Sequence, residues 1–64
     1  MPFNTSDFFS TYLRQPKGQG FWMFVVQTFD GNVEFDFNGT FTAAKAACRK
    51  AFKGQDVIEV RVLG

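Results

Sequence analysis

The part of the chain after residue 20 has a hydrophobic pattern that restricts the fold more than any other feature of the sequence. Two stretches rich in β-branched and aromatic residues flank the dipeptide Asp30-Gly31, which is typical of a tight hairpin turn. A helical spacing of apolar residues follows, and a final stretch alternates between apolar and polar residues. The pattern predicts strands at residues 21–29, 33–37 and 57–63 and a helix at residues 41–53. The predicted element order is therefore ββαβ.

The first predicted strand is apolar on both faces, which sets it apart from the other two. Phe21 and Met23 would point to one face, and Trp22 and Phe24 to the other. The last strand would place Ile58, Val60 and Val62 inward and Glu59 and Arg61 outward. A strand that is apolar on both sides is typical of the middle of a sheet. With a right-handed crossover, we predict an α+β fold: a three-stranded antiparallel sheet of order 2-1-3, with one helix packed on a face.

The hairpin leaves two registers open. A two-residue Asp30-Gly31 loop would pair Phe29 with Asn32, and a three-residue loop that includes Asn32 would shift the register by one. The first places Trp22, Phe24 and Val26 beside Val33, Phe35 and Phe37, and the second places Phe21, Met23 and Val25 there. Because Asp-Gly is a favoured type I′ pair, we favour the two-residue loop.

Composition limits the class of protein. The 64 residues make one domain, whose ten Phe can supply most of a small core. A net charge of +1 favours neither a strong polyanion binder nor a nucleic-acid mimic. No apolar run is long enough for a membrane span and no signal peptide is evident, so we expect a cytoplasmic protein. The lone Cys48 excludes an internal disulfide, and without His or a metal-ligand motif we expect no enzyme, metal or cofactor.

Residues 1–20 are less regular and are predicted to form an N-terminal arm or lid with a short helical or irregular segment. Residues 15–20 contain Pro16 and two Gly, as expected of a linker to a ββαβ domain at residues 21–64. Asn4 can cap a short helix with Asp7 at its third position. Phe9, Tyr12 and Leu13 would share one face of that helix, with Phe8 beside them. The segment either packs on the domain as a lid or docks on a partner as an aromatic arm.

The predicted helix combines a narrow apolar face with a cationic one. Thr40 is a natural N-cap, and the apolar face holds Phe41, Ala44, Ala47, Cys48, Ala51 and Phe52. The exposed side holds Lys45, Arg49, Lys50 and Lys53. These cations either complement the helix dipole as a solvated face or form a docking surface for an acidic partner or a phosphate backbone.

The segment Lys17-Gly18-Gln19-Gly20-Phe21-Trp22-Met23-Phe24 resembles the octapeptide of RNA-recognition and cold-shock domains, which places aromatics on a strand to stack bases. Gln19 replaces an aromatic of that pattern, Trp22 stands where an aliphatic is expected, and the segment begins the first strand of the sheet. The resemblance implies an alternative function, a single-stranded nucleic-acid-binding protein. Its candidate residues are Lys17, Phe21, Trp22, Lys45, Arg49 and Lys53.

A second resemblance covers the chain from Phe21 to its end. It rests on Phe21-Trp22, the alternation at residues 33–37, Thr40-Phe41-Thr42-Ala43-Ala44 and Val60-Arg61-Val62. In element order and length the chain resembles the small early proteins by which lytic podophages inhibit host RNA polymerase. That family folds as one helix on a three-stranded antiparallel sheet and uses arginines of the last strand against an acidic part of the polymerase. Arg61 can take that role here, whereas Leu63 stands where a second arginine is expected.

The favoured hypothesis is a small non-enzymatic protein-binding module, a phage-encoded inhibitor of bacterial RNA polymerase or of another host machine. It would act in the host cytoplasm as a monomer or weak homodimer. Its partner-binding residues would be Arg61, Glu59, Glu34, Asp36, Phe21 and Met23, because aromatic and Arg anchors dominate binding energy at interfaces.

Overall fold

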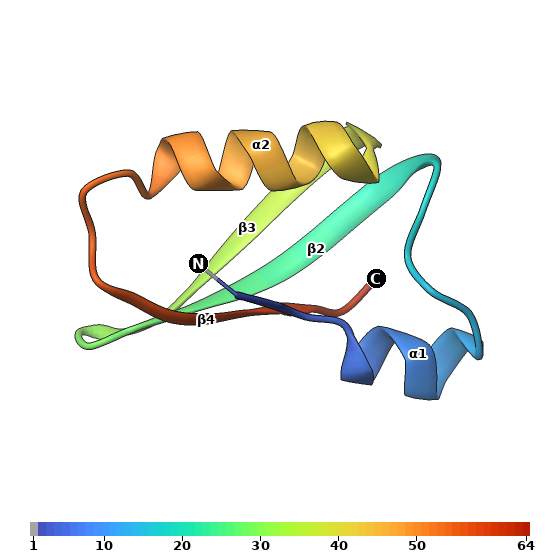
Figure 1. Cartoon of the computed structure of the whole chain (residues 1–64), viewed down its shortest axis with the longest axis horizontal. Helices are drawn as coiled ribbons and strands as arrows, with labels where there is room; N and C mark the ends of the chain where they lie inside the picture. The colour runs from blue at the N-terminus through green and yellow to red at the C-terminus, as the bar shows by residue number, and fades with distance from the viewer. Residues whose placement is uncertain (1) are drawn as a thin grey trace.

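The computed structural model describes residues 2–64, which form a four-stranded mixed sheet and two helices (Figure 1). The elements in chain order are β1 (Phe3–Asn4), α1 (Ser6–Tyr12), β2 (Gln19–Thr28), β3 (Gly31–Thr40), α2 (Phe41–Ala51) and β4 (Val57–Val62). The sheet order is β1-β4-β2-β3, with β1 parallel to β4 and the other pairs antiparallel. Helix α2 lies over one face, and α1 lies at one end of the sheet (Figure 1).

The α+β class and the arrangement of the three predicted strands, with residues 21–29 in the middle, are confirmed. The three-stranded antiparallel sheet is wrong, because β1 adds a parallel fourth strand beside β4. The short N-terminal segment, predicted to be helical or irregular, contains the second helix, α1. A strand of two residues is too short to show the alternation by which strands are recognised. Its position depends instead on contacts with β4, which follows it by more than fifty residues.

The β2–β3 hairpin turns one residue earlier than predicted. Thr28 pairs with Gly31, so the loop is Phe29-Asp30 and not Asp30-Gly31. The Thr28 hydroxyl donates to the Gly31 carbonyl (2.8 Å) and accepts from the Asp30 N–H (3.2 Å), while Gly31 has a φ of +124° that favours glycine. Compared with the predicted register, each β2 residue pairs with a β3 residue two positions earlier in the chain. An even shift keeps every side chain on its predicted face. Trp22, Phe24 and Val26 do share a face with Val33, Phe35 and Phe37.

The core lies between the sheet and α2. Its buried residues are Phe8, Trp22, Phe24, Val26, Phe41, Ala44, Cys48, Val60 and Val62. The prediction of Ile58 as an inward residue is wrong: Ile58 is exposed, and Val57 packs against the core instead. The β2–β4 register shifts between Gln27 and Thr28, which pair with Glu59 and Val57. This irregularity leaves Ile58 without a partner and reverses the alternation at the start of β4.

Helix α2 begins as predicted, because the Thr40 hydroxyl accepts a hydrogen bond from the Ala43 N–H at 3.1 Å. Ala51 lies outside the buried face to which it was assigned.

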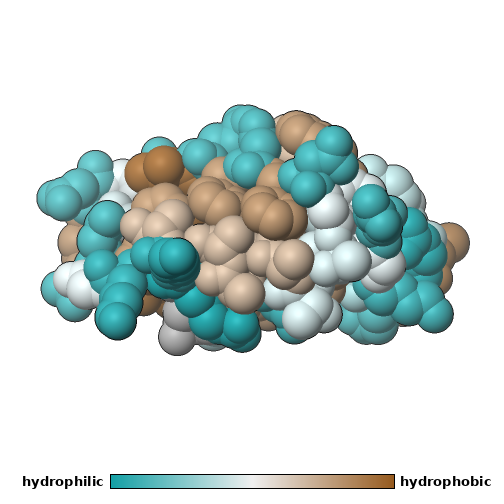
Figure 2. Space-filling model, turned by 90° about the horizontal axis from the view of Figure 1, so that it is seen from above, coloured by the Kyte–Doolittle hydropathy of each residue, from teal (hydrophilic) through white to brown (hydrophobic). Residues whose placement is uncertain are grey.

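Seen from the side of α2, hydrophobic groups occupy the middle of the surface and hydrophilic groups surround them (Figure 2). In the part of the chain that the structure describes, no helix has both the length and the apolar character needed to cross a membrane.

The N-terminal segment packs on the domain. Phe8 of α1 is buried with its ring centroid 5.6 Å from that of Trp22, and Phe3 of β1 meets Phe24 edge-on at 5.7 Å. The N-cap of α1 is Thr5 and not Asn4, although the Asn4 side chain accepts a hydrogen bond from the N–H of Ser6, the first residue of α1. The three residues that were predicted to share one face of α1, Phe9, Tyr12 and Leu13, are all exposed, and Phe8 is the residue of α1 that is buried.

Candidate protein-binding surface on the sheet

The face of the sheet opposite α2, here called the outer face, has no helix over its middle (Figure 1). Side chains alternate along a strand, so this face is opposite the buried set Trp22, Phe24 and Val26. It holds Phe21, Met23, Val25 and Gln27 of β2, Asn32, Glu34, Asp36 and Asn38 of β3, and Glu59, Arg61 and Leu63 from β4 onward. The four β2 residues lie in the middle of these three rows, between the polar residues of β3 and those of β4.

An apolar patch lies in the middle of the outer face. Phe21 is 58% exposed, Met23 and Val25 are half-buried, and Leu63 is exposed beside Met23. Leu63 is held there because its N–H donates to the Met23 carbonyl at 2.9 Å and the Met23 N–H donates to the Gly64 carbonyl at 3.0 Å. A cluster of exposed and partly exposed apolar side chains on a sheet face is typical of an interaction surface.

Two carboxylates border this patch along β3. Met23 lies opposite Asp36, and Val25 lies opposite Glu34. The two acids are two residues apart on one face, so a hydrogen bond with Asp36 and its negative charge raise the pKa of Glu34 above the ordinary glutamate value. Neither acid has an ion-pair partner within residues 2–64. This side of the outer face is therefore negatively charged at neutral pH.

Arg61 and Glu59 lie on the outer face as predicted, but both contact the N-terminal segment. The Arg61 guanidinium forms an ion pair with Asp7 of α1 (Nη2–Oδ2, 2.5 Å), and not with Glu59 or Glu34. Asn4 Nδ2 donates to Glu59 Oε1 at 2.8 Å. These contacts hold β1 and α1 against β4. Sequence reasoning assigned Asp7 and Asn4 to the start of a helix and missed their contacts with β4, because residues so far apart in the chain give no local signal of their proximity.

The residues predicted to bind nucleic acid lie in several parts of the structure and not on the outer face alone. Trp22 is buried and its Nε1 donates to the Gly39 carbonyl at 3.0 Å, so its ring is not free to stack on a base. The Lys45 ammonium lies 4.8 Å from the Phe41 ring centroid, and the Arg49 guanidinium lies 5.0 Å from that of Phe3. Lys53 is exposed just after the end of α2.

Lys17 and Phe21 border a shallow pocket of about 170 Å³ at the end of the sheet where α1 lies. Arg14, which sequence reasoning did not single out, also lines it and places its guanidinium 5.2 Å from the Phe8 ring centroid and 5.9 Å from that of Tyr12. The structure therefore brings together two cations and exposed aromatic rings at this end of the molecule.

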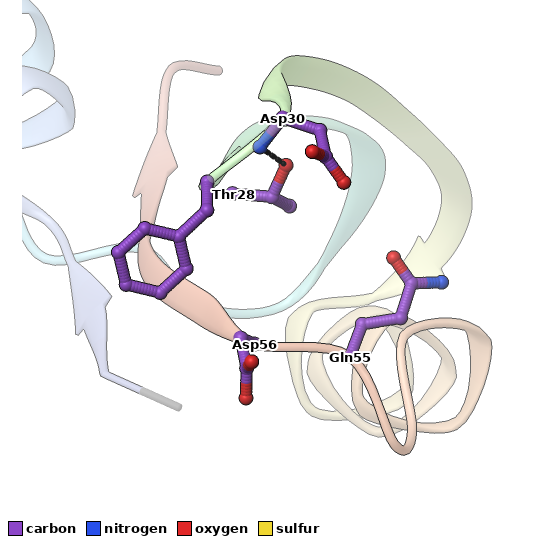
Figure 3. Close-up of a pocket in the computed structure, with 5 residues that line it drawn as sticks. Thr28, Asp30, Gln55 and Asp56 are labelled. Carbon is purple, nitrogen blue, oxygen red and sulfur yellow. Dashed lines mark hydrogen bonds between the residues drawn. The ribbon is translucent and has the colours of Figure 1, made fainter.

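A second pocket, of about 180 Å³, lies between the β2–β3 hairpin and the loop after α2 (Figure 3). Its lining residues are Thr28, Phe29, Asp30, Gln55 and Asp56. Sequence reasoning assigned no site here, and within residues 2–64 no group of three or more Cys, Asp or Glu side chains is placed to hold a metal ion. The two acids make this end of the molecule polar.

Cys48 points into the core from α2. Burial raises the pKa of its thiol, and the neighbouring Arg49 charge opposes that shift only in part. A protonated, buried thiol is a poor nucleophile.

The outer face thus combines an apolar patch, a pair of acids along β3 and an arginine that is already paired with an acid of the same chain. Comparisons of the chain with protein-family models, with curated proteins and with solved structures give no match.

Proposed function

We propose that this chain is a small non-enzymatic protein-binding module and that it binds its partner through the outer face of the sheet. The observation that carries the proposal is the exposure of Phe21 beside Met23, Val25 and Leu63 on a face whose middle no helix covers. Aromatic side chains surrounded by polar groups are typical anchors of protein interfaces.

Because the chain resembles the podophage inhibitors, the partner that we propose is bacterial RNA polymerase or another host machine. In that family the arginines of the last strand contact an acidic part of the polymerase. Arg61 is paired with Asp7 here and keeps 43% of its side chain exposed. A partner carboxylate can therefore bind Arg61 only if it shares the guanidinium with Asp7 or displaces Asp7. Glu34 and Asp36, in contrast, are free to bind basic groups. We expect Phe21, Met23, Glu34 and Asp36 to contribute more to binding than Arg61 does.

The test compares two exposed phenylalanines. Phe21→Ser removes the anchor of the apolar patch, and Phe29→Ser removes a 78% exposed ring in the hairpin loop, beyond the end of β2. Both variants and the unchanged protein are immobilised and offered purified bacterial RNA polymerase, and then a bacterial lysate whose captured proteins are identified by mass spectrometry. We expect Phe21→Ser to lose its partner and Phe29→Ser to keep it. Equal capture by both variants would overturn the proposal.

A nucleic-acid-binding function is the second candidate, and the observation that favours it is the pocket that joins Arg14 and Lys17 to Phe21. Binding of single-stranded oligonucleotides, measured at rising salt, separates the two functions. A nucleic-acid binder loses affinity steeply with salt because it releases counterions. Under the protein-binding proposal, oligonucleotides bind weakly at all salt concentrations, and Arg14→Gln and Lys17→Gln leave partner capture unchanged.

A further inference from the structure

The two edges of the sheet differ in how they are covered. At the β4 edge, β1 pairs with Val60 and Arg61, and the Val60 N–H donates to the Pro2 carbonyl at 3.0 Å. At the other edge, β3 spans ten residues, and no strand within residues 2–64 pairs with its outward side. An edge of this length exposes N–H and C=O groups that can pair with another chain.

The hydrogen-bond pattern shows which β3 groups are free. Met23 uses both its N–H and its C=O toward residues 63 and 64, so in β2 the odd-numbered residues bond toward β4 and the even-numbered ones toward β3. Phe24 and Trp22 therefore bond to their partners Phe35 and Phe37. The backbone N–H and C=O groups of Glu34 and Asp36 consequently point away from the sheet.

The side chains along this edge differ between its two faces. On the α2 side, Val33 is 44% exposed and Phe35 and Phe37 are half-buried. The Phe35 ring meets Phe52 at a centroid distance of 6.2 Å, which extends the apolar layer to the edge. On the outer face, Glu34 and Asp36 are exposed and have no ion-pair partner within residues 2–64. An added strand would therefore have apolar neighbours on one face and carboxylates on the other.

We propose that the β3 edge binds an extended peptide segment in which cationic and apolar residues alternate, and that the segment adds to the sheet as a fifth strand. Residues opposite Glu34 and Asp36 would point to the outer face and place their cations beside the two carboxylates. The residues between them would point to the α2 side and cover Val33, Phe35 and Phe37. The site shares Glu34 and Asp36 with the outer face, but it uses the backbone edge of β3 and not the Phe21 patch, and it therefore goes beyond the function proposed above.

A second copy of this chain fits the edge poorly. Two β3 strands pairing about Phe35 would place Glu34 opposite Asp36 twice, and like charges directly opposite each other are destabilising. The same carboxylates that oppose self-pairing favour a cationic strand. The charge of the edge therefore selects the peptide over the second copy.

The test uses a labelled peptide of alternating lysine and valine, matched in length to β3. One control peptide alternates glutamate and valine, and another has the lysines in one block and the valines in the next. Fluorescence anisotropy measures binding to the unchanged protein and to Glu34→Pro and Glu34→Gln. Both variants remove the charge, but Glu34→Pro also removes an outward N–H, a change that edge strands tolerate. We expect Glu34→Pro to bind about tenfold more weakly than Glu34→Gln, as for the loss of one backbone hydrogen bond.

Hydrogen exchange on the unchanged protein gives a second measurement that does not depend on the folding of a variant. The lysine–valine peptide should slow exchange at the Glu34 and Asp36 amides and leave the Phe35 amide, which is already bonded to β2, nearly unchanged.

Three outcomes would each overturn the proposal: equal binding of the three peptides, equal affinity of the two Glu34 variants, or a sedimenting dimer of the free protein at neutral pH. Phe21→Ser should bind the lysine–valine peptide normally, so a failure here is distinguishable from a failure of the outer-face proposal.

Discussion

Phe24 and Met23 are neighbours in β2, yet their side chains have opposite surroundings. Phe24 is 0% exposed and its ring lies near those of Phe3, Phe35 and Phe41, whereas Met23 lies half-buried on the outer face. Truncating a buried Phe to Ala costs about 3–5 kcal/mol, a large part of the stability of so small a domain. We expect Phe24→Ala to unfold the protein or nearly so, and Met23→Ala to cost about 1 kcal/mol. Chemical denaturation of both variants measures the free energy of unfolding. A larger loss of stability for Met23→Ala would contradict the placement of Phe24 on the α2 side and Met23 on the outer face.

Glu34 should titrate above an ordinary glutamate, because the neighbouring Asp36 raises its pKa. The side-chain carboxyl shift of Glu34, followed by NMR against pH, should move back toward the ordinary value in Asp36→Asn. The sign for stability follows from linkage: a carboxyl whose folded-state pKa is raised binds more protons in the folded state, so its contribution to stability increases as the pH falls through that pKa. Midpoints that are equal in the two proteins would show that Asp36 does not act on Glu34.

At the scale of the elements, the Arg61–Asp7 ion pair connects α1 to β4. Both side chains are about two-fifths exposed, at 43% and 41%, so the pair should contribute modestly to stability. A double-mutant cycle with Asp7→Asn and Arg61→Gln should give a coupling free energy of about 0.2–1 kcal/mol that decreases with added salt. Amide exchange in α1 should accelerate in both single variants while exchange in β2 stays unchanged. A coupling near zero would show that the ion pair does not help to hold α1 against β4.

The strands and α2 could be predicted because each repeats a pattern over several residues. Residues 33–37 alternate, and Thr40 caps a helix whose apolar spacing continues to Cys48. The details that failed depend on single contacts instead. The hairpin follows the Thr28 hydroxyl and not the Asp-Gly dipeptide, and Val57 replaces Ile58 in the core because of one irregular pairing with β2.

The candidate site was predictable in its composition but not in its pairing. Alternation alone places Phe21, Glu34 and Asp36 on the outer face, and the structure has them there. The ion pair between Arg61 and Asp7 depends on where α1 packs. That position results from the burial of Phe8 against Trp22. No local pattern in residues 1–20 indicates that Phe8, and not its neighbour Phe9, is the buried ring.

At the scale of the whole molecule, residues 2–64 should unfold as one cooperative unit, because Phe8 of the N-terminal segment belongs to the same buried cluster as the sheet and α2. Calorimetric and van't Hoff enthalpies of unfolding should therefore agree. Phe8→Ala should lower the single Tm by about 10 °C or more, and the matched control Phe9→Ala, which truncates an exposed ring, should change it little. Two separate transitions would show instead that the N-terminal segment is a detachable arm.

Trp22 gives this protein an optical reporter of its own. It is the single tryptophan of the chain, and its indole lies between the rings of Phe8 in α1 and Phe41 in α2, with centroid distances of 5.6 and 4.9 Å. If a partner displaces α1, water reaches the indole and its fluorescence emission moves to longer wavelength. A partner that binds with α1 in place leaves the emission unchanged. An unlabelled sample in a fluorimeter can therefore distinguish a partner that opens the N-terminal segment from one that binds the molecule as it stands.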